Sequence, residues 1–306
     1  MNAVTVLGGD GAADPFYTGD LSVLGQVSTA SNLTLVCEIT ADGTVRDAGR
    51  RARADRARAG RVYRAAAGES MVRVVYKPVR GERPLWDFPD GTLAGREVAS
   101  YLVSQALGWP VIPETILRDG PYGVGMVQRW IQSPEVAGDP DDAQVTQPRP
   151  DLVDLVPAGA VPEGFLEVLR AVDGTGAEVS LVHADDPRLY RMAVLDVLIN
   201  NADRKGGHAL AGVDGGVYGV DHGICLHAEP KLRTVLWGWA GSPVDADLLD
   251  DIAGLLPKLS GGVGDALAEH ITDEEIQALA ARTRRLLADP VMPLPRSSRP
   301  IPWPAF

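Results

Sequence analysis

The chain of 306 residues is 45% hydrophobic, which is enough to bury a core in one large domain or in two lobes. Its formal net charge of -12 argues against a nucleic-acid binder and against a protein held to anionic lipid by charge. The two cysteines do not make a disulfide framework, and we expect a cytoplasmic protein with no leader segment and no stable membrane association.

The first part of the chain is predicted to consist mainly of strands. Residues 1–20 are rich in Gly and Asp and are expected to be loose. The apolar runs at 21–24 and 34–39 flank the stretch GQVSTASN and predict a hairpin with a flexible tip. Residues 41–70 are Arg-rich. We expect a solvated excursion there, and a segment that binds an anionic partner is the alternative.

A strand, a helix and two strands are predicted next. Met71–Val79 alternates like a strand. Residues 91–108 have helical spacing, with Gly108 at the end of the helix. Two further strands are predicted at 111–117 and 123–131.

The second part of the chain is predicted to be mainly helical. It follows a linker or loop at 133–160 that is rich in Pro and acidic residues. The predicted helices span 165–172, 187–200, 245–256, 263–270 and 273–287, with a short strand at 217–220. Residues 291–306 form a Pro-rich tail that we expect to be extended. This order predicts an α+β fold of two lobes, a β-rich N-lobe at 21–132 and a mainly helical C-lobe at 161–290.

Residues that suit phosphoryl transfer follow the predicted helix at 187–200. The stretch NNADRKGGH contains Asp203, Lys205 and His208, and Asp221 follows the short strand. Upstream, Lys77 ends a strand and Glu97 lies on the next helix. Phosphoryl transfer uses a Lys–Glu pair that steadies the phosphates, an Asp that orients the attacking hydroxyl, and ligands for divalent metal.

Three stretches resemble the protein-kinase-like superfamily on its phosphatidylinositol 3-/4-kinase and HipA side. They are VVYKPVRGERPLWDFPDGTLAGREVASYLVSQALGW, RMAVLDVLINNADRKGGHAL and YGVDHGICLH. They look most like an actinobacterial family described as phosphatidylinositol-kinase-like. The resemblance implies a two-lobed kinase-like fold, a cleft that binds ATP, and Mg²⁺ or Mn²⁺ as the metal.

The resemblance also implies site residues. Asp203 matches the catalytic aspartate, and Asp221 matches a metal-binding aspartate. The nucleotide-binding residues that it implies, from the strand–helix pair, the hairpin tip, the adenine hinge and the loop after the helix, are Lys77, Glu97, Gly25, Ser28, Ser31, Met126, Gln128, Trp130 and Lys205. The tip lacks the GxGxxG pattern of protein kinases, so only backbone and Ser contacts are expected there.

His208 departs from the family pattern, which has Asn five residues after the catalytic Asp. An imidazole nitrogen suits Mn²⁺, Zn²⁺ or Fe better than Mg²⁺. We therefore expect His208 and Asp221 to be the metal ligands, with a bias toward Mn²⁺. A His208 that bonds a backbone carbonyl without metal is the alternative. A zinc site that adds His222 and His227 is a further possibility.

The function that we expect is ATP-dependent phosphotransfer to a hydroxyl of a protein or a small soluble substrate. A pseudokinase that binds nucleotide or a partner protein without turnover is one alternative, and a nucleotidyl transferase is another. In a structural interpretation, Asp203 pairs with Arg204 at a helix end and Lys77 forms a surface ion pair with Glu97. Asp196 lies on an apolar helix and needs a partner, for which Arg191 and Arg204 are available.

Overall fold

The computed structural model describes residues 14–27, 30–40, 71–134 and 151–306. The Arg-rich segment 41–70 and Ser28 lie outside this part of the chain. The protein consists of two compact units. Unit 1 consists of Met1–Arg83 and Leu117–Trp130, and unit 2 consists of Pro84–Ile116 and Ile131–Phe306. The division differs from the predicted N-lobe at 21–132, because the segment 84–116 belongs to unit 2.

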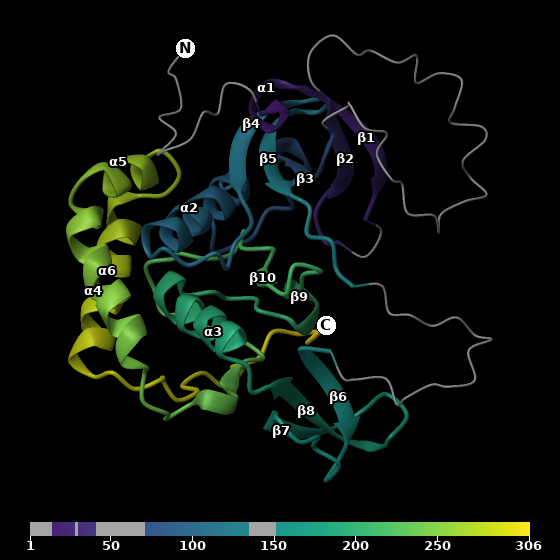
Figure 1. Cartoon of the computed structure of the whole chain (residues 1–306), viewed down its shortest axis with the longest axis vertical. Helices are drawn as coiled ribbons and strands as arrows, with labels where there is room; N and C mark the ends of the chain where they lie inside the picture. The colour runs from purple at the N-terminus through teal and green to yellow at the C-terminus, as the bar shows by residue number, and fades with distance from the viewer. Residues whose placement is uncertain (1–13, 28–29, 41–70, 135–150) are drawn as a thin grey trace. The chain divides into compact units, whose positions relative to one another are not determined.

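A five-stranded sheet forms unit 1, with the strand order β1-β2-β3-β5-β4 (Figure 1). Its strands are β1 (Asp20–Gln26), β2 (Leu35–Thr40), β3 (Val72–Pro78), β4 (Thr115–Gly120) and β5 (Gly123–Arg129). β2 alternates between buried and half-buried residues, as a strand with one face toward a core should. The predicted strands at 21–24, 34–39, 71–79 and 123–131 are confirmed, whereas the strand predicted at 111–117 begins later, at Thr115.

Part of the segment predicted to be loose has regular structure. α1 (Pro15–Thr18) begins after Asp14, whose carboxylate accepts from the backbone N–H of Phe16. The Phe16 side chain is fully buried, and the Arg129 guanidinium lies 4.3 Å from the centre of its ring. The prediction for residues 1–20 is therefore wrong from Asp14 onward.

Unit 2 contains five α-helices in its described residues. They are α2 (Leu93–Ala106), α3 (Pro187–Ile199), α4 (Ala246–Leu259), α5 (Gly262–Ala268) and α6 (Asp273–Ala288). α4 and α6 run side by side (Figure 1), and α3 is lined by fully buried side chains such as Leu195 and Leu198. α6 begins with the capping box between Thr272 and Glu275 that the TDEE stretch predicts. The helices predicted at 91–108, 187–200, 245–256, 263–270 and 273–287 are confirmed.

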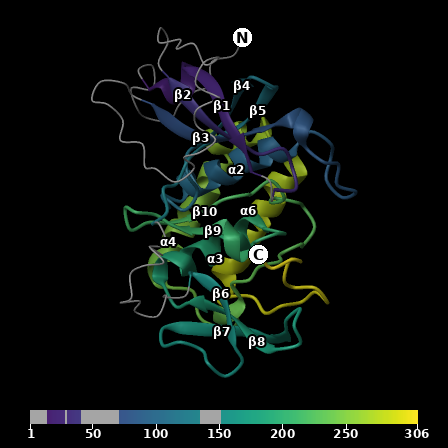
Figure 2. The ribbon, with the colours of Figure 1, turned by 90° about the vertical axis from the view of Figure 1, so that its right-hand side faces the viewer.

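A three-stranded sheet replaces the helix predicted at 165–172. Its strands are β6 (Val153–Pro157), β7 (Phe165–Val172) and β8 (Glu178–Ala184), in the order β6-β8-β7. β6 also lies within the linker predicted at 133–160, whose residues 135–150 are outside the described chain. Both views show this sheet at one end of unit 2 and α2 at the other (Figures 1 and 2).

A short hairpin completes unit 2. β9 (Ala209–Ala211) pairs with β10 (Val217–Gly219), which confirms the strand predicted before Asp221. The α+β class is also confirmed. In the part of the chain that the structure describes, no helix combines the length and apolar character that a membrane span requires.

Candidate active site

The loop after α3 is fixed at its first residue. α3 ends at Ile199, and Asn200 adopts the left-handed conformation with φ 55°, which Asn tolerates better than most residues. Its side-chain amide donates to the carbonyls of His227 and Glu229 at 2.9 and 2.7 Å, and its oxygen accepts from the N–H of Lys231 at 2.8 Å. The residues that follow, which we call the 200–208 loop, therefore start from a defined position.

Arg204 holds the centre of the 200–208 loop. Its side chain is fully buried and forms a two-point ion pair with Asp196, with N···O distances of 2.8 Å for both bonds. The guanidinium also donates to the carbonyls of His208 and Val220 at 3.0 and 3.2 Å. Burial works to lower the pKa of Arg204, but the Asp196 carboxylate outweighs it and the pKa lies above its ordinary value. Of the two partners expected for Asp196, Arg204 is confirmed.

Backbone hydrogen bonds join the 200–208 loop to neighbouring segments. The N–H of Ala202 donates to Ile224, and the N–H of Arg204 donates to Arg233, both at 3.1 Å. The Asn201 side chain donates to Asp196 and accepts from the N–H of Asp203, both at 2.9 Å. The Asp203 backbone is thus held by a side chain that is itself buried.

The Asp203 carboxylate shares its surroundings with one cation and one anion. Lys205 Nζ lies 3.5 Å from Asp203 Oδ2, and the two side chains are 17% and 25% exposed. Burial raises the pKa of Asp203 above its ordinary value, Lys205 opposes the rise, and the Asp221 carboxylate adds to it. Asp203 and Asp221, predicted from separate stretches of sequence, are therefore close enough to influence each other's charge.

His208 faces Asp221 through a defined ring nitrogen. Its Nδ1 lies 3.0 Å from the backbone oxygen of Asp203, which can only accept, so Nδ1 carries a proton. Nε2 lies 3.4 Å from Asp221 Oδ2. In the neutral ring, Nε2 consequently directs its lone pair toward the carboxylate. The carbonyl bond that was the alternative for His208 is present, and it orients the ring toward Asp221.

A side chain of α2 holds the segment around Asp221. Asp221 has φ 61°, a left-handed conformation that Asp adopts more readily than bulkier residues. The backbone N–H of the next residue, His222, donates to Glu97 Oε2 at 2.8 Å. Arg204 Nη2 lies 2.7 Å from His222 Nε2, so this nitrogen accepts the bond from Arg204. Glu97 and Arg204 therefore hold the residue that follows Asp221 from two sides.

A second buried ion pair supports these residues and was not predicted from the sequence. Arg96, one residue before Glu97, lies 2.6 Å from Glu275 of α6 and donates to the carbonyl of Cys225 at 3.0 Å. Both side chains of the pair are at most 8% exposed. The signal that was available is an arginine inside the predicted helix at 91–108, since a charge that becomes buried needs a partner.

Unit 1 contains the other predicted nucleotide-binding residues. Lys77 on β3 is the register partner of Met126 on β5, so the two side chains lie on one face of the sheet. Met126 and Gln128 are buried, Trp130 is 41% exposed, and Gly25 and Ser31 are exposed. Lys77 belongs to unit 1 and Glu97 to unit 2. Their pairing stays a prediction.

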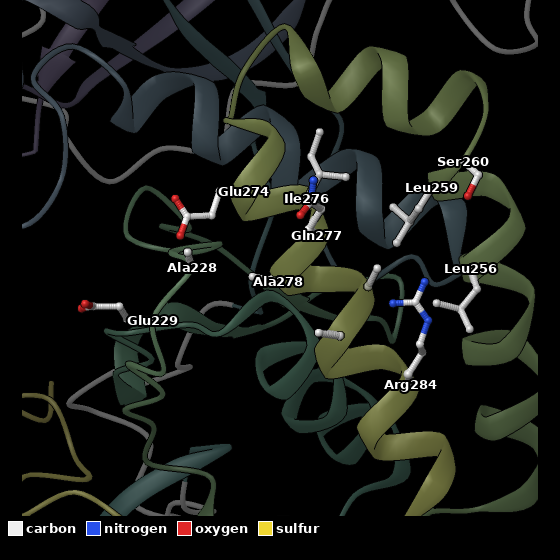
Figure 3. Close-up of a pocket in the computed structure, with 12 residues that line it drawn as sticks. Ala228, Glu229, Leu256, Leu259, Ser260, Glu274, Ile276, Gln277, Ala278 and Arg284 are labelled. Atoms are coloured by element: carbon white, nitrogen blue, oxygen red, sulfur yellow. The ribbon is translucent and has the colours of Figure 1, made fainter.

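The zinc site that would add His222 and His227 is not present among the described residues, where no group of three or more His, Cys, Asp or Glu is arranged to hold a metal ion. His222 Nε2 is bonded to Arg204, and the His227 ring packs against Phe88. A pocket on unit 2 lies elsewhere, along α4 and α6 beside Ala228 and Glu229 (Figure 3). None of the predicted site residues lines it.

Comparison with known proteins identifies a family. No family model matches the chain. The Mycobacterium tuberculosis protein Rv2133c is 56% identical over 288 residues, which cover 94% of this chain and 93% of the relative. The chain belongs to the family of Rv2133c. This confirms the predicted actinobacterial family, and the likeness to phosphatidylinositol 3-/4-kinases stays a prediction. Among solved structures, the Helicobacter pylori proinflammatory kinase CtkA matches with a TM-score of 0.34 and 12% identity, over 76% of this chain and 91% of that chain.

The raised pKa of Asp203 gives an expected stability effect for this member of the Rv2133c family. Since Asp203 ionises less readily in the folded protein than in the unfolded chain, its charge destabilises the fold at neutral pH. The penalty begins as the pH rises through the ordinary value of 3.8 and is complete above the raised pKa. Asp203→Asn is therefore expected to raise the melting temperature at pH 7, with a gain that disappears below pH 3.8. Thermal unfolding across pH measures it, and a variant that is less stable than wild type at pH 7 would contradict the assignment.

Proposed function

We propose that the protein is an ATP-dependent phosphotransferase that acts on a hydroxyl group of a protein or a small soluble molecule. The observation that carries the proposal is the approach of His208 Nε2 and Asp221 Oδ2 to 3.4 Å, together with the effect of the Asp221 charge on the pKa of Asp203. Two ligand-type atoms and a carboxylate of raised pKa are what metal-dependent transfer to a hydroxyl needs.

The residues fit a divalent cation that takes most of its ligands from nucleotide and water. One carboxylate oxygen and one neutral imidazole nitrogen face each other, and Mg²⁺ or Mn²⁺ sites of this kind are completed by phosphate oxygens. His208 Nδ1 donates to the Asp203 carbonyl, which fixes the ring so that Nε2 is the ligand. A bound cation would neutralise charge on the phosphates during transfer.

Asp203 has the role of accepting the proton of the attacking hydroxyl, or of orienting it. Its raised pKa makes it a stronger base than a solvated carboxylate. Lys205, at 3.5 Å from Asp203 Oδ2, places a positive charge where phosphate oxygens would arrive. We assign Lys77 and Glu97 to the binding of the ATP phosphates. The hairpin tip, with Gly25, Ser28 and Ser31, would cover these phosphates. The adenine would bind at Met126, Gln128 and Trp130.

Membrane lipid is a poor substrate for this protein. The net charge is -12, and outside the Arg-rich segment 41–70 the sequence has no cluster of Lys and Arg of the kind that attaches a protein to anionic lipid. A soluble hydroxyl acceptor is consistent with this charge. We propose a cytoplasmic site of action, because the two cysteines of the sequence do not make a disulfide framework.

Labelled ATP distinguishes the proposal from its alternatives. With ATP labelled at the γ-phosphate, phosphotransfer moves label to protein or metabolite fractions. With ATP labelled at the α-phosphate, only a nucleotidyl transferase does so. A pseudokinase transfers neither label but still binds nucleotide. Absence of transfer from the γ-position with both Mg²⁺ and Mn²⁺ would overturn the proposed activity.

His208→Asn is expected to change the metal preference. An amide oxygen suits Mg²⁺, whereas the wild-type imidazole favours Mn²⁺, so the ratio of turnover in Mn²⁺ to that in Mg²⁺ should fall about tenfold. His270→Asn is the control for the loss of an imidazole, because His270 precedes α6 and is not one of the predicted site residues. An unchanged metal ratio in His208→Asn would show that His208 is not a ligand.

A further inference from the structure

The 291–306 tail is attached to unit 2 at three places. At its start, the backbone of Met292 exchanges hydrogen bonds with Gly241 and Ser242, at 2.9 and 2.8 Å. Further along, the carbonyl of Pro300 accepts from the N–H of Thr234 at 3.0 Å and from the indole of Trp237 at 2.9 Å. The composition of the tail predicts an extended segment, but these bonds hold it against the protein.

The third attachment is to the 200–208 loop. The N–H of Gly206 donates to the carbonyl of Ala305 at 2.8 Å. Thr234, which binds the tail at Pro300, also forms a parallel β-bridge with Arg204. Both views place the end of the chain beside β9, the strand that directly follows the loop (Figures 1 and 2). The tail therefore runs next to the segment that carries Asp203.

The Phe306 ring covers Gly206. A Cβ built on Gly206 would lie 2.3 Å from Cε1 and 2.6 Å from Cδ1 of that ring. Gly206 does not have a positive φ, so the backbone conformation does not require glycine there. The neighbouring Gly207 is different, because a Cβ built on it meets no atom within 4 Å. Gly206 is buried and Gly207 is exposed.

We propose that Ala305 and Phe306 form a strap that positions the 200–208 loop for catalysis. The two glycines between Lys205 and His208 have no side chains with which to pack, so the backbone there depends on neighbouring segments. The strap supplies one hydrogen bond to Gly206 and one aromatic ring above it. Phe306 is thus a positioning residue that acts through Gly206 on Lys205 and Asp203. This role rests on the proposed phosphotransfer.

The test measures hydrogen–deuterium exchange of the amides in the 200–208 loop together with the kinetics of phosphotransfer. In Phe306→Ala, hydrogen–deuterium exchange at the Gly206 amide should become at least about tenfold faster, because its bond to Ala305 is no longer covered. The kcat for phosphotransfer should fall by about tenfold while the Kd for ATP rises by less, since displacement of Asp203 slows the reaction and Lys205 is one of several residues assigned to the nucleotide. Phe306→Tyr keeps the ring and should restore both values.

Gly206→Ala tests the same contact from the other side. Its Cβ collides with the ring and should displace Phe306, so amides 205–208 should exchange as fast as in Phe306→Ala. In the double variant, which combines Phe306→Ala with Gly206→Ala, these amides should exchange no faster than in either single variant, because the contact can be lost only once. Gly207→Ala is the matched control and should keep wild-type exchange, since its Cβ points into open space.

The two parts of the test fail separately. If the amides of the loop exchange at the wild-type rate in both Phe306→Ala and Gly206→Ala, the proposal that the strap positions the loop is wrong. Faster exchange with an unchanged kcat would also overturn it, because the contact would then be structural only. If the wild-type protein transfers no phosphate, the proposed activity fails, and exchange alone decides whether the strap holds the loop.

Discussion

Asp203→Asn is expected to lower kcat for phosphotransfer by about 10²–10⁴-fold, the usual contribution of a positioned general base. An amide cannot accept the proton of the hydroxyl, but it keeps the size of the side chain. The Kd for ATP with metal should change little, because the proposed metal ligands are His208 and Asp221. Single-turnover transfer from γ-labelled ATP and equilibrium binding of ATP measure the two quantities on the same preparation.

Two further variants make this assignment specific. Asp250→Asn removes an exposed carboxylate from α4 and should leave kcat unchanged. Asp221→Asn removes a proposed ligand charge and should weaken the binding of ATP in the presence of metal. If Asp203→Asn and Asp221→Asn lose ATP binding equally, Asp203 is not the base.

Arg204→Met is expected to produce the largest loss of stability. It leaves the fully buried Asp196 carboxylate without its cation, and breaking a buried ion pair in this way costs about 3–5 kcal/mol. For a chain of this size the melting temperature should fall by on the order of 10 °C. Differential scanning calorimetry measures it.

Matched variants test whether the loss of stability is specific to the buried arginine. Arg188→Met breaks the ion pair with Asp186, in which Arg188 is 51% exposed, and should cost no more than about 1 kcal/mol. Replacing both Arg204 and Asp196 by apolar residues should recover part of the loss, because no unpaired charge remains in the core. A fall in melting temperature for Arg204→Met no larger than that for Arg188→Met would contradict the central role of Arg204.

Local chemistry made the helices of unit 2 predictable. Asp186 caps α3 by accepting from the N–H of Arg188, and Pro187 takes the first helical position. Thr272 and Glu275 form the capping box of α6. Such signals depend on residues a few positions apart, so one sequence is sufficient to read them.

The strand at 165–172 was mistaken for a helix because a β-bulge hides its alternation. The register of β7 against β8 shifts between Glu167 and Leu169. The extra residue moves apolar side chains to spacings of three and four, which also fit a helix. The strand predicted at 111–117 is present but begins later, at Thr115, because Pro113 cannot donate a ladder hydrogen bond.

The sequence was most informative about which residues belong to the site and least informative about what supports them. Asp203, Lys205, His208 and Asp221 were expected together because short segments connect them, and they lie close together in unit 2. The supports come from distant parts of the chain. Glu275 and Phe306 illustrate this, since no local pattern shows that they meet Arg96 and Gly206.

Calorimetric titration of ATP, with and without Mn²⁺ or Mg²⁺, tests the central claim most directly. The wild-type protein should bind ATP, divalent metal should tighten the binding at least about tenfold, and Asp221→Asn should remove most of that gain while remaining folded. No binding at millimolar ATP with either metal, or an equal gain from metal in wild type and Asp221→Asn, would contradict a nucleotide–metal site at His208 and Asp221.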